Sequence, residues 1–279
     1  MDVLNLIPTH TQDEVNPQAE GDYIGEDGLL YCGKCHTKKQ TIVKWMDGDK
    51  VFPVICRCES EKREQEQRER EREEMLEKVR RLKQASMMSS VFFGAKFEAY
   101  QSRQENEQAL KIAQNYVKKW EEMKKQNQGL ILYGTVGTGK SFTAACIANA
   151  LLEQSVEVIM TSFVKILQDI QHIDDEGEYV KRLNRAELLI IDDLGAERNT
   201  DYALEKVYNI IDSRVRIAKP MILTTNLDIK EMQATTDIRY GRIYDRIFEV
   251  CFPVGMFGKS FRLTQAADRY MQTKAMLTE

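Results

Sequence analysis

Residues 134–141 are the part of this 279-residue chain with the clearest chemical purpose. They read GTVGTGKS and fit the pattern GxxxxGK[ST]. Glycines let the backbone wrap with its N–H groups aimed at phosphate oxygens, and the helix that follows adds its positive N-terminal end. Lys140 is expected to reach the outer phosphates of ATP or ADP, and the Ser141 hydroxyl to ligate Mg²⁺. The predicted nucleotide-contacting residues are Gly134, Thr135, Val136, Gly137, Thr138, Gly139, Lys140, Ser141 and Phe142.

Two adjacent carboxylates, Asp192 and Asp193, follow an apolar run that begins at Leu188. Ligands bind at the carboxyl ends of strands in a doubly wound sheet, so Asp192 is placed to hold magnesium and Asp193 to orient or deprotonate the attacking water. A third apolar run ends at Asn226, which is expected to hold that water beside the γ-phosphate. Taken alone, the two acids are also compatible with an ordinary loop start, and Asn226 with a strand-end turn.

These side chains need a scaffold in which strands and helices alternate. Apolar, strand-like runs are expected at 129–133, 156–160, 188–191, 221–224 and 248–252. Helices are expected at about 106–125, 140–153, 163–173, 202–218 and 238–246. Short apolar strands between helices imply a parallel sheet covered on both faces. The predicted fold class is therefore α/β, with a P-loop NTPase core.

Four of the six cysteines lie in two close pairs near the N-terminus. Cys32 and Cys35 form a CxxC pair, and Cys56 and Cys58 form a tighter CxC pair. The runs 41–45 and 51–55 around an Asp-Gly turn predict a hairpin between the pairs, which brings four thiolates together as zinc prefers. Free or redox thiols and an iron–sulfur centre are the alternatives, and His36 could replace one ligand. Cys146 and Cys251 are interpreted as small buried residues.

The chain divides by composition into three segments. Residues 1–58 are expected to hold a loose, acidic arm (1–28) and the cysteine module. Residues 59–90 form a linker, helical over 59–83, where nine acidic and nine basic residues alternate without Gly or Pro and Ser86 to Ser90 then break the helix. Residues 91–279 form the ATPase domain.

Charge and hydropathy limit the classes of protein to which the chain can belong. The formal net charge of −4 creates no global basic field for nucleic acid. No apolar run approaches the roughly 18 residues of a membrane helix. The first 31 residues carry seven acidic groups and neither Lys nor Arg, which argues against a signal or transit peptide. We therefore expect a cytoplasmic location without membrane contact.

The order of these elements resembles an AAA+ ATPase: a Walker A loop, a Walker B strand and a sensor-1 residue. Three short motifs resemble those of the DnaC/DnaI-type replicative helicase loaders, especially phage and Firmicute-like ones: IDDLGAER at 191–198, TDY at 200–202 and TTNL at 224–227. The resemblance covers about residues 91–265 and extends more weakly over the cysteine module and the charged helix.

The resemblance implies roles for three arginines. In GRIYDRI at 241–247, which is similar to the family's GxRxxDR segment, Arg246 would be an arginine finger that reaches a nucleotide on a neighbouring subunit, with Arg242 as its companion. Arg262 matches the sensor-2 position, which contacts the γ-phosphate in cis. Many AAA+ motors carry Glu at the position of Asp193, so we expect slow hydrolysis, closer to a switch than to a motor.

The resemblance also implies partners: a hexameric replicative helicase held by the N-terminal region, single-stranded DNA, and self-association through the ATPase domain. The leading hypothesis is thus an ATP-dependent helicase loader with ATP/ADP, Mg²⁺ and Zn²⁺ as cofactors. The alternatives are an IstB-type ATPase helper of DNA transposition and a nucleotide-gated adaptor without meaningful hydrolysis. The set Asn226, Arg246 and Arg262 disfavours a small-molecule P-loop kinase.

Overall fold

A computed structural model describes residues 19–46, 48–99, 106–196 and 200–278 of the chain. It separates into two compact units, residues 1–75 and 76–279. Most of the predicted N-terminal arm lies outside the described residues. Asp47 of the predicted turn and residues 197–199 of the loader-like motif also lie outside them. The three-segment division at residues 58 and 90 stays a prediction. No helix of the described ranges combines the length and the apolar character that a membrane span requires.

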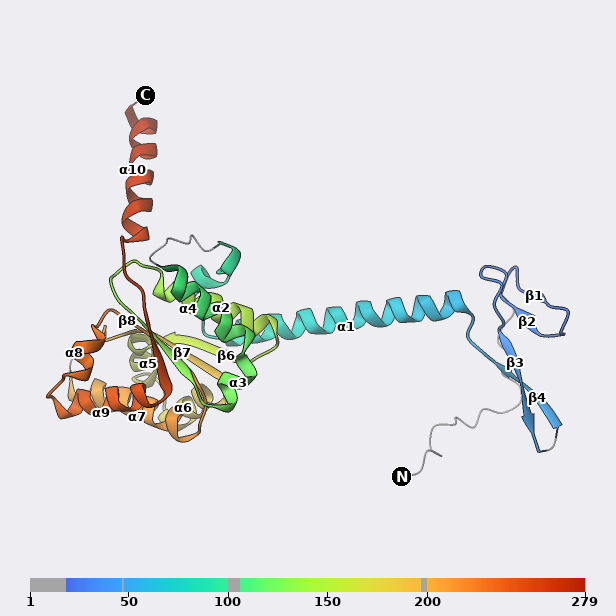
Figure 1. Ribbon diagram of the computed structural model, residues 1–279, viewed down its shortest axis with the longest axis horizontal. Coiled ribbons are helices and arrows are strands. Elements are labelled where there is room, and N and C mark those ends of the chain that lie inside the picture. The colour runs from blue at the N-terminus through green and yellow to red at the C-terminus, as the bar shows by residue number, and fades with distance from the viewer. Residues whose placement is uncertain (1–18, 47, 100–105, 197–199, 279) are drawn as a thin grey trace. The chain divides into compact units, whose positions relative to one another are not determined.

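The first unit is built from two small antiparallel sheets (Figure 1). The strands are β1 (Tyr23–Ile24), β2 (Leu30–Tyr31), β3 (Gln40–Trp45) and β4 (Gly48–Pro53). β1 pairs with β2, and β3 pairs with β4 in the predicted hairpin. This hairpin separates the two cysteine pairs along the chain.

The predicted charged helix is α1, which runs over Arg57–Ala85 and contains no buried residue. Ion pairs one turn apart, such as Arg63 with Glu59 at 3.1 Å, stabilise its exposed surface. The helix ends where the Ser86 hydroxyl donates to the Lys83 carbonyl at 2.7 Å and Met87 takes a φ of 58°. The boundary between the compact units falls inside this helix, and Leu82 near its end packs against the second unit's core.

The second unit is the predicted parallel sheet with helices on both faces (Figure 1). Its strands lie in the order β6 (Val158–Ser162), β7 (Leu188–Leu194), β8 (Met221–Thr225), β5 (Gly129–Tyr133) and β9 (Cys251–Gly255). Every neighbouring pair is parallel. The carboxyl ends of all five strands therefore share one edge, and β5 lies between β8 and β9 there.

Two apolar layers cover the sheet. The first layer holds α2 (Glu107–Lys118), α3 (Trp120–Lys125) and α4 (Lys140–Glu153) over side chains such as Leu130 and Leu132. The second layer holds α5 (Phe163–Ile170), α6 (Glu176–Arg185), α7 (Asp201–Arg216), α8 (Ile229–Gln233) and α9 (Ile238–Val250) over side chains such as Ile131. The short 3₁₀ helices η2 (Ser90–Phe92) and η3 (Phe97–Ala99) precede the sheet, and α10 (Phe261–Thr278) follows it.

The last strand lies three residues later than the sequence predicts. We expect a strand at 248–252, but α9 continues to Val250 and β9 occupies Cys251–Gly255. Ile243, Ile247 and Val250 recur at helical spacing and are all buried against the second layer. Tertiary packing on this stripe extends the helix through an apolar run that also suits a strand. Helices α6, α8 and α10 are likewise absent from the sequence prediction.

Candidate functional site

The glycine-rich loop connects β5 to α4, as the pattern predicts. Gly134 has a φ of 129°, and a Cβ there would lie 2.2 Å from the Met256 carbonyl oxygen, so only glycine fits. The Thr138 hydroxyl donates to the Thr135 carbonyl at 2.9 Å inside the loop. Gly139, with a φ of 95°, immediately precedes Lys140, the first residue of α4. The N-terminal end of α4 therefore begins directly at this loop, in the arrangement that binds phosphate.

Lys140 is folded onto the loop and is only 5% exposed. Its Nζ donates to the carbonyl oxygens of Gly134 at 3.0 Å and Thr135 at 2.8 Å. Burial lowers the pKa of Lys140, whereas the charges of Asp193 and Asp192 oppose that shift. The ammonium thus lies within electrostatic reach of both acids, at the place where nucleotide phosphates would bind.

Ser141 and Asp192, the predicted magnesium ligands, are brought together. The Ser141 hydroxyl forms a hydrogen bond with the Asp192 carboxylate. Burial raises the pKa of Asp192, while hydrogen bonds from Thr224 and Ser141 favour its ionised form. A serine hydroxyl beside a carboxylate is an oxygen donor set that suits Mg²⁺.

Asp193 and Asn226 lie at the same edge of the sheet. Asp193 is exposed and has a φ of 56°, in the left-handed region that non-glycine residues seldom adopt. Its backbone N–H donates to Thr224 Oγ1 at 2.9 Å. Asn226 is exposed directly after β8, the neighbour of β7. The two side chains proposed to handle water are therefore both open to solvent.

The segment between β9 and α10 contacts the phosphate loop, and Arg262 is the second residue of α10. The Phe261 N–H donates to the Gly137 carbonyl at 2.9 Å, and the Thr135 hydroxyl donates to the Gly258 carbonyl at 3.3 Å. Arg262 is exposed, and its charge lowers the pKa of Lys140. The backbone beside Arg262 thus contacts the phosphate loop, and the charge of Arg262 acts on Lys140.

Arg246 is held elsewhere, on the face where α9 packs against α7. Its Nε lies 3.1 Å from Asp212 Oδ1, and its Nη1 donates to Glu249 at 2.8 Å. Glu249 is the main cause of the raised pKa of Arg246. Arg242 is exposed one turn earlier on the same helix. Within one chain, the structure shows no contact of Arg246 with the described residues of the phosphate loop.

Sequence reasoning missed two polar residues that support the site. Thr224 donates to Asp192 Oδ1 at 2.5 Å and is fully buried. Asn106 is 2% exposed, and its amide donates to the Thr138 carbonyl of the phosphate loop at 3.1 Å. The position of Thr224 at the end of an apolar strand was the sequence feature that could have indicated its role. Nothing in the local pattern marked Asn106.

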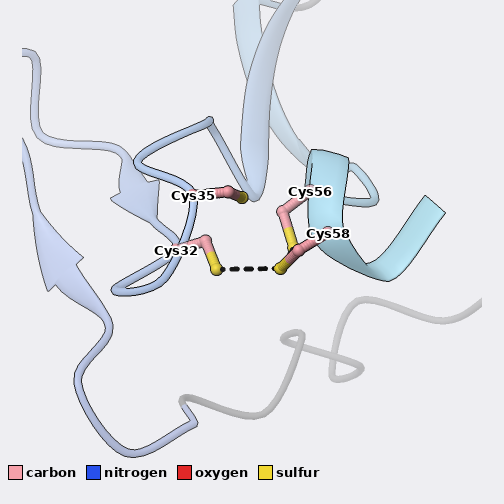
Figure 2. A group of neighbouring side chains, drawn as sticks. All are labelled: Cys32, Cys35, Cys56 and Cys58. Atoms are coloured by element: carbon pink, nitrogen blue, oxygen red, sulfur yellow. Dashed lines mark hydrogen bonds between the residues drawn. The ribbon is translucent and has the colours of Figure 1, made fainter. Parts of the chain in front are cut away.

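The four predicted metal-binding cysteines converge on one point (Figure 2). Their sulfur atoms all lie within 4.8 Å of one another, and Cys58 Sγ lies 3.5 Å from both Cys32 Sγ and Cys56 Sγ. Tetrahedral zinc with Zn–S bonds of about 2.3 Å requires sulfur separations of about 3.8 Å. The sulfur atoms therefore lie near the separations that a tetrahedral Zn²⁺ site requires. Cys146 and Cys251 are buried, as expected.

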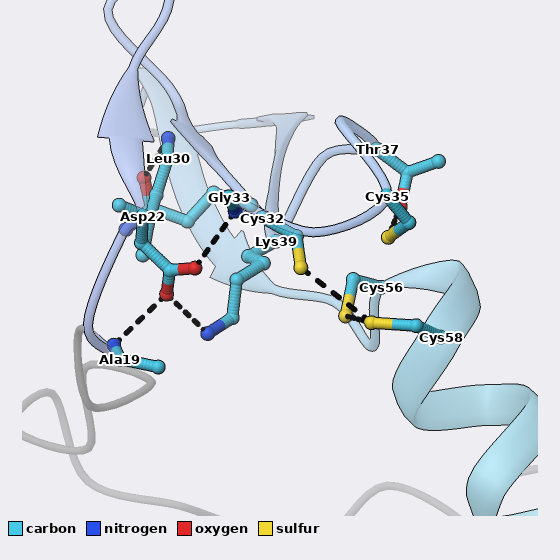
Figure 3. A network of polar contacts seen from close by, with 11 residues as sticks. Ala19, Asp22, Leu30, Cys32, Gly33, Cys35, Thr37, Lys39, Cys56 and Cys58 are labelled. Carbon is cyan, nitrogen blue, oxygen red and sulfur yellow. Dashed lines mark hydrogen bonds and ion pairs between the residues drawn. The ribbon is translucent and has the colours of Figure 1, made fainter.

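Hydrogen bonds already orient the sulfur atoms (Figure 3). The backbone N–H groups of Cys35 and Lys34 donate to Cys32 and lower its pKa. The Thr37 hydroxyl, 3.1 Å from Cys35 Sγ, is the main cause of the lowering of the pKa of Cys35 to about 5. The surrounding thiols, Cys56 first, raise the pKa of Cys58 to about 12. Concentrated thiolate charge of this kind is what a divalent cation would relieve.

Hydrogen bonds and an ion pair of Asp22 connect the segments around this cluster (Figure 3). The Asp22 carboxylate accepts hydrogen bonds from the Gly33 N–H at 3.1 Å, the Ala19 N–H at 2.9 Å and the Lys39 ammonium at 2.5 Å. The Lys39 bond is the main reason that the pKa of Asp22 falls to about 2. His36 lies 3.3 Å from the Tyr23 hydroxyl, outside the four-sulfur set, so the alternative of a histidine ligand gains no support.

Comparison with known proteins shows relatives over most of the second unit. The family model of IstB-like ATP binding proteins matches residues 63–268. The PBSX phage-like element protein XkdC of Bacillus subtilis is 30% identical over 181 residues, which are 60% of this chain and 67% of XkdC. The replicative helicase loader DnaI of B. subtilis is 26% identical over 199 residues, 64% of each chain. DnaC of Escherichia coli is 28% identical over 176 residues, 61% of this chain and 69% of DnaC. The chain thus spans about two thirds of these relatives' length.

Solved structures show the same fold. The crystal structure of DnaI superposes with a TM-score of 0.54 at 23% identity, covering 62% of this chain and 93% of that one. The DnaC helicase loader gives 0.53 at 22% identity, covering 60% and 99%. Both comparisons support the AAA+ type of parallel sheet. Because the family match covers well over half of the residues, this chain belongs to the family of IstB-like ATP-binding proteins and is homologous to the DnaI and DnaC helicase loaders.

Proposed function

We propose that this protein is a cytoplasmic, ATP-dependent loader that holds a hexameric replicative helicase through its N-terminal unit. Nucleotide binding and hydrolysis then control delivery of the helicase onto single-stranded DNA when replication begins. Two relatives, DnaI and DnaC, carry the name of replicative helicase loader, and the family match begins only at residue 63. The cysteine module thus lies outside the region that the ATP-binding family model matches, and we assign it the role of binding the helicase.

The observation that carries the proposal is the apolar surface of the β3–β4 hairpin. Val43, Trp45 and Phe52 lie on one face, which we call the Trp45 face, because Thr41 pairs with Phe52 and Val43 with Lys50. These three side chains are 38%, 53% and 39% exposed, and the rings of Trp45 and Phe52 lie 6.5 Å apart. Aromatic side chains exposed on a small rigid module are typical anchors of protein interfaces.

A zinc ion would make this surface rigid. The described residues of the first unit bury few apolar side chains, such as Leu29 and Leu30. A module with so small a core usually needs a bound metal or a disulfide for stability. The proposed ligands are Cys32, Cys35, Cys56 and Cys58. We therefore assign the metal a structural role: it holds the hairpin in the shape that the helicase recognises.

In the second unit we assign each polar group a step in ATP use. Lys140 would bind the outer phosphates, and Ser141 with Asp192 would hold Mg²⁺, which neutralises phosphate charge. Asp193 would accept the proton of the attacking water, and Asn226 would orient that water. Because aspartate is one methylene shorter than the glutamate of many AAA+ motors, hydrolysis should be slow, below about 10 turnovers per second, the median for enzymes.

Two arginines would complete the site, one of them from a second copy of the chain. Arg262 approaches the phosphate loop of its own chain. Arg246 would act on a neighbour's γ-phosphate, and self-association would then exchange its ion pairs with Asp212 and Glu249 for phosphate oxygens. Guanidinium groups at that position stabilise the charge that develops during phosphoryl transfer.

The decisive experiment is size-exclusion chromatography with light scattering. The full chain is mixed with the replicative helicase of its source in ATP and in ADP. Three variants are measured beside it. The first lacks residues 1–75 but keeps Leu82, and the second is the double variant Trp45→Ala/Phe52→Ala. The third, Ile42→Ala/Val51→Ala, changes the opposite face of the hairpin and is the matched control. We expect a complex that the truncation and the Trp45-face variant lose and the control keeps. Loss of two interface anchors costs about 2 kcal/mol each, or about 30-fold in affinity each.

A transposition helper of the IstB type is the second candidate, since the family model that matches residues 63–268 carries that name. The cysteine module, which lies outside the matched residues, favours the loader. Absence of any helicase complex in every nucleotide state, together with an active ATPase, would support the helper instead.

A further inference from the structure

Strand β7 holds one more residue than β8 at the nucleotide site. Ile191 pairs with Leu223, and Leu194 pairs with Thr225, so Asp192 and Asp193 together lie opposite Thr224 alone. The backbone accommodates the extra residue at Asp193, where φ is 56°. A bulge of this kind re-aims side chains and leaves regular ladder hydrogen bonds unmade.

The Thr224 side chain replaces the missing ladder bonds. The Asp193 N–H donates to Thr224 Oγ1 at 2.9 Å, and the Thr224 hydroxyl donates onward to Asp192 Oδ1 at 2.5 Å. Thr224 is 0% exposed, so water does not compete for either bond. Because one oxygen both accepts and donates, each bond polarises and strengthens the other.

The Asp192 carboxylate is consequently held from two sides. Ser141 approaches it from α4, and Thr224 approaches it from β8. The same threonine stabilises the left-handed residue whose carboxylate charge acts on Lys140. One hydroxyl thus supports both acidic positions of the site while lying beneath them in the sheet.

We propose that Thr224 is a positioning residue of the nucleotide site: its hydroxyl fixes the Asp192 carboxylate toward Ser141 and holds the turn that presents Asp193. The inference rests on the proposed ATP function and adds to it a residue that acts only through its neighbours. Groups that orient a metal ligand in this way typically change metal affinity or activity by about 10- to 100-fold when they are removed.

The test compares three full-length variants. Thr224→Val removes the hydroxyl and keeps the shape, and Thr224→Ser keeps the hydroxyl. Thr161→Val is the matched control, because Thr161 is a buried threonine on β6 whose hydroxyl has no hydrogen-bond partner among the described residues. The measurements are ATP affinity with and without Mg²⁺, kcat and KM for hydrolysis, and amide exchange of the segment 188–196 in metal-free protein.

For Thr224→Val we expect unchanged ATP affinity without Mg²⁺, a 10- to 100-fold higher Mg²⁺ requirement, a similar loss in kcat, and faster exchange of the Asp193 amide. Thr224→Ser should restore most of each value, and Thr161→Val should match the wild type. A folded Thr224→Val protein with wild-type Mg²⁺ dependence and exchange would overturn the inference, and so would failure of the serine variant to restore them. If the wild type hydrolyses no ATP, the proposed enzymatic step fails, but the binding and exchange measurements still decide the role of Thr224.

Discussion

The backbone N–H of Phe261 donates to the carbonyl oxygen of Gly137 at 2.9 Å and so joins the phosphate loop to the first residue of α10. The two residues are 124 positions apart in the chain. Arg262 is the next residue, and its charge lowers the pKa of Lys140. Together with the hydrogen bond from the Thr135 hydroxyl to the Gly258 carbonyl, this bond connects the phosphate loop to the segment that begins α10.

Replacing Gly137 tests this junction. Gly137 has a φ of 80°, and a Cβ there would lie 2.1 Å from Ser260 Oγ. For Gly137→Ala we expect ATP affinity to fall by tenfold or more, about 1.4 kcal/mol, because the loop and the α10 junction must separate. Isothermal titration calorimetry measures the affinity. Gly94→Ala, where a Cβ meets nothing within 4 Å, is the matched control and should bind like the wild type.

Lys140→Ala should weaken nucleotide binding strongly. The variant loses the ammonium that lies over the loop, and at least a tenfold loss in affinity is expected from removal of a charged phosphate contact. Fluorescence titration with a labelled ATP analogue provides the measurement. Lys219 also donates to two backbone carbonyls, those of Asn184 and Arg185, so Lys219→Ala controls for loss of such bonds. Equal binding by both variants would contradict the assignment of Lys140.

Asp193→Asn should separate binding from hydrolysis. Asparagine tolerates left-handed backbone well, so the φ of 56° at this position predicts an intact fold. We expect kcat to fall by about 10²- to 10⁴-fold, the usual contribution of a general base, with ATP affinity little changed. A coupled phosphate-release assay measures the rate. Full retention of turnover would show that another group activates the water, and retention of replication function despite a slow rate would favour a binding switch.

The purified chain should carry about one zinc per molecule, held by the four-cysteine set. Cys35→Ser is expected to lose the metal and to unfold the first unit while the second unit keeps nucleotide binding, because the units are separately compact. Metal analysis by mass spectrometry and proteolysis of residues 1–75 provide the readouts. Cys146→Ala lies in the core of the second unit and should retain the zinc. A metal-free wild type with an ordered hairpin would contradict the structural role of zinc.

The stability of the helix that carries Arg242 and Arg246 should depend on pH through Asp237. Its carboxylate caps α9 by accepting the Arg239 N–H at 2.9 Å, and the Arg239 side chain is the main cause that lowers its pKa from 3.8 to about 2. A depressed pKa in the folded state means that the stabilisation is complete above pH 3.8 and is lost as the pH falls toward 2.

The variant Asp237→Asn isolates this effect. Asparagine still caps a helix but carries no charge. Its melting temperature should lie below that of the wild type at pH 7, and the difference should shrink as the pH is lowered from about 4 to 2. A difference that stays constant over this range would show that the charge of Asp237 does not matter.

Features that depend on local spacing were predictable from the order of the residues. The run 134–141 predicts a phosphate loop because glycines, lysine and serine act within one turn of chain, and the structure has the strand and helix that flank it at the expected residues. The cysteine pairs and the hairpin between them likewise fix a four-sulfur cluster. Alternating charge without apolar periodicity was enough to predict α1. In the phosphate loop and in α1 the determining interactions lie within a few residues of one another, and a single hairpin joins the two cysteine pairs, which are about 20 residues apart.

Tertiary structure decided what depends on register and on packing between distant segments. Thr224 donates a hydrogen bond to Asp192 only because a bulge places two residues of β7 opposite one residue of β8. No local sequence pattern predicts this bulge. Arg246 meets Asp212 only because α9 packs on α7, and β9 begins at Cys251 because burial of one helical stripe extends α9. The order of the strands places the phosphate loop between β8 and β9. These relationships arise from burial of whole surfaces against each other, so they exist only in the folded chain.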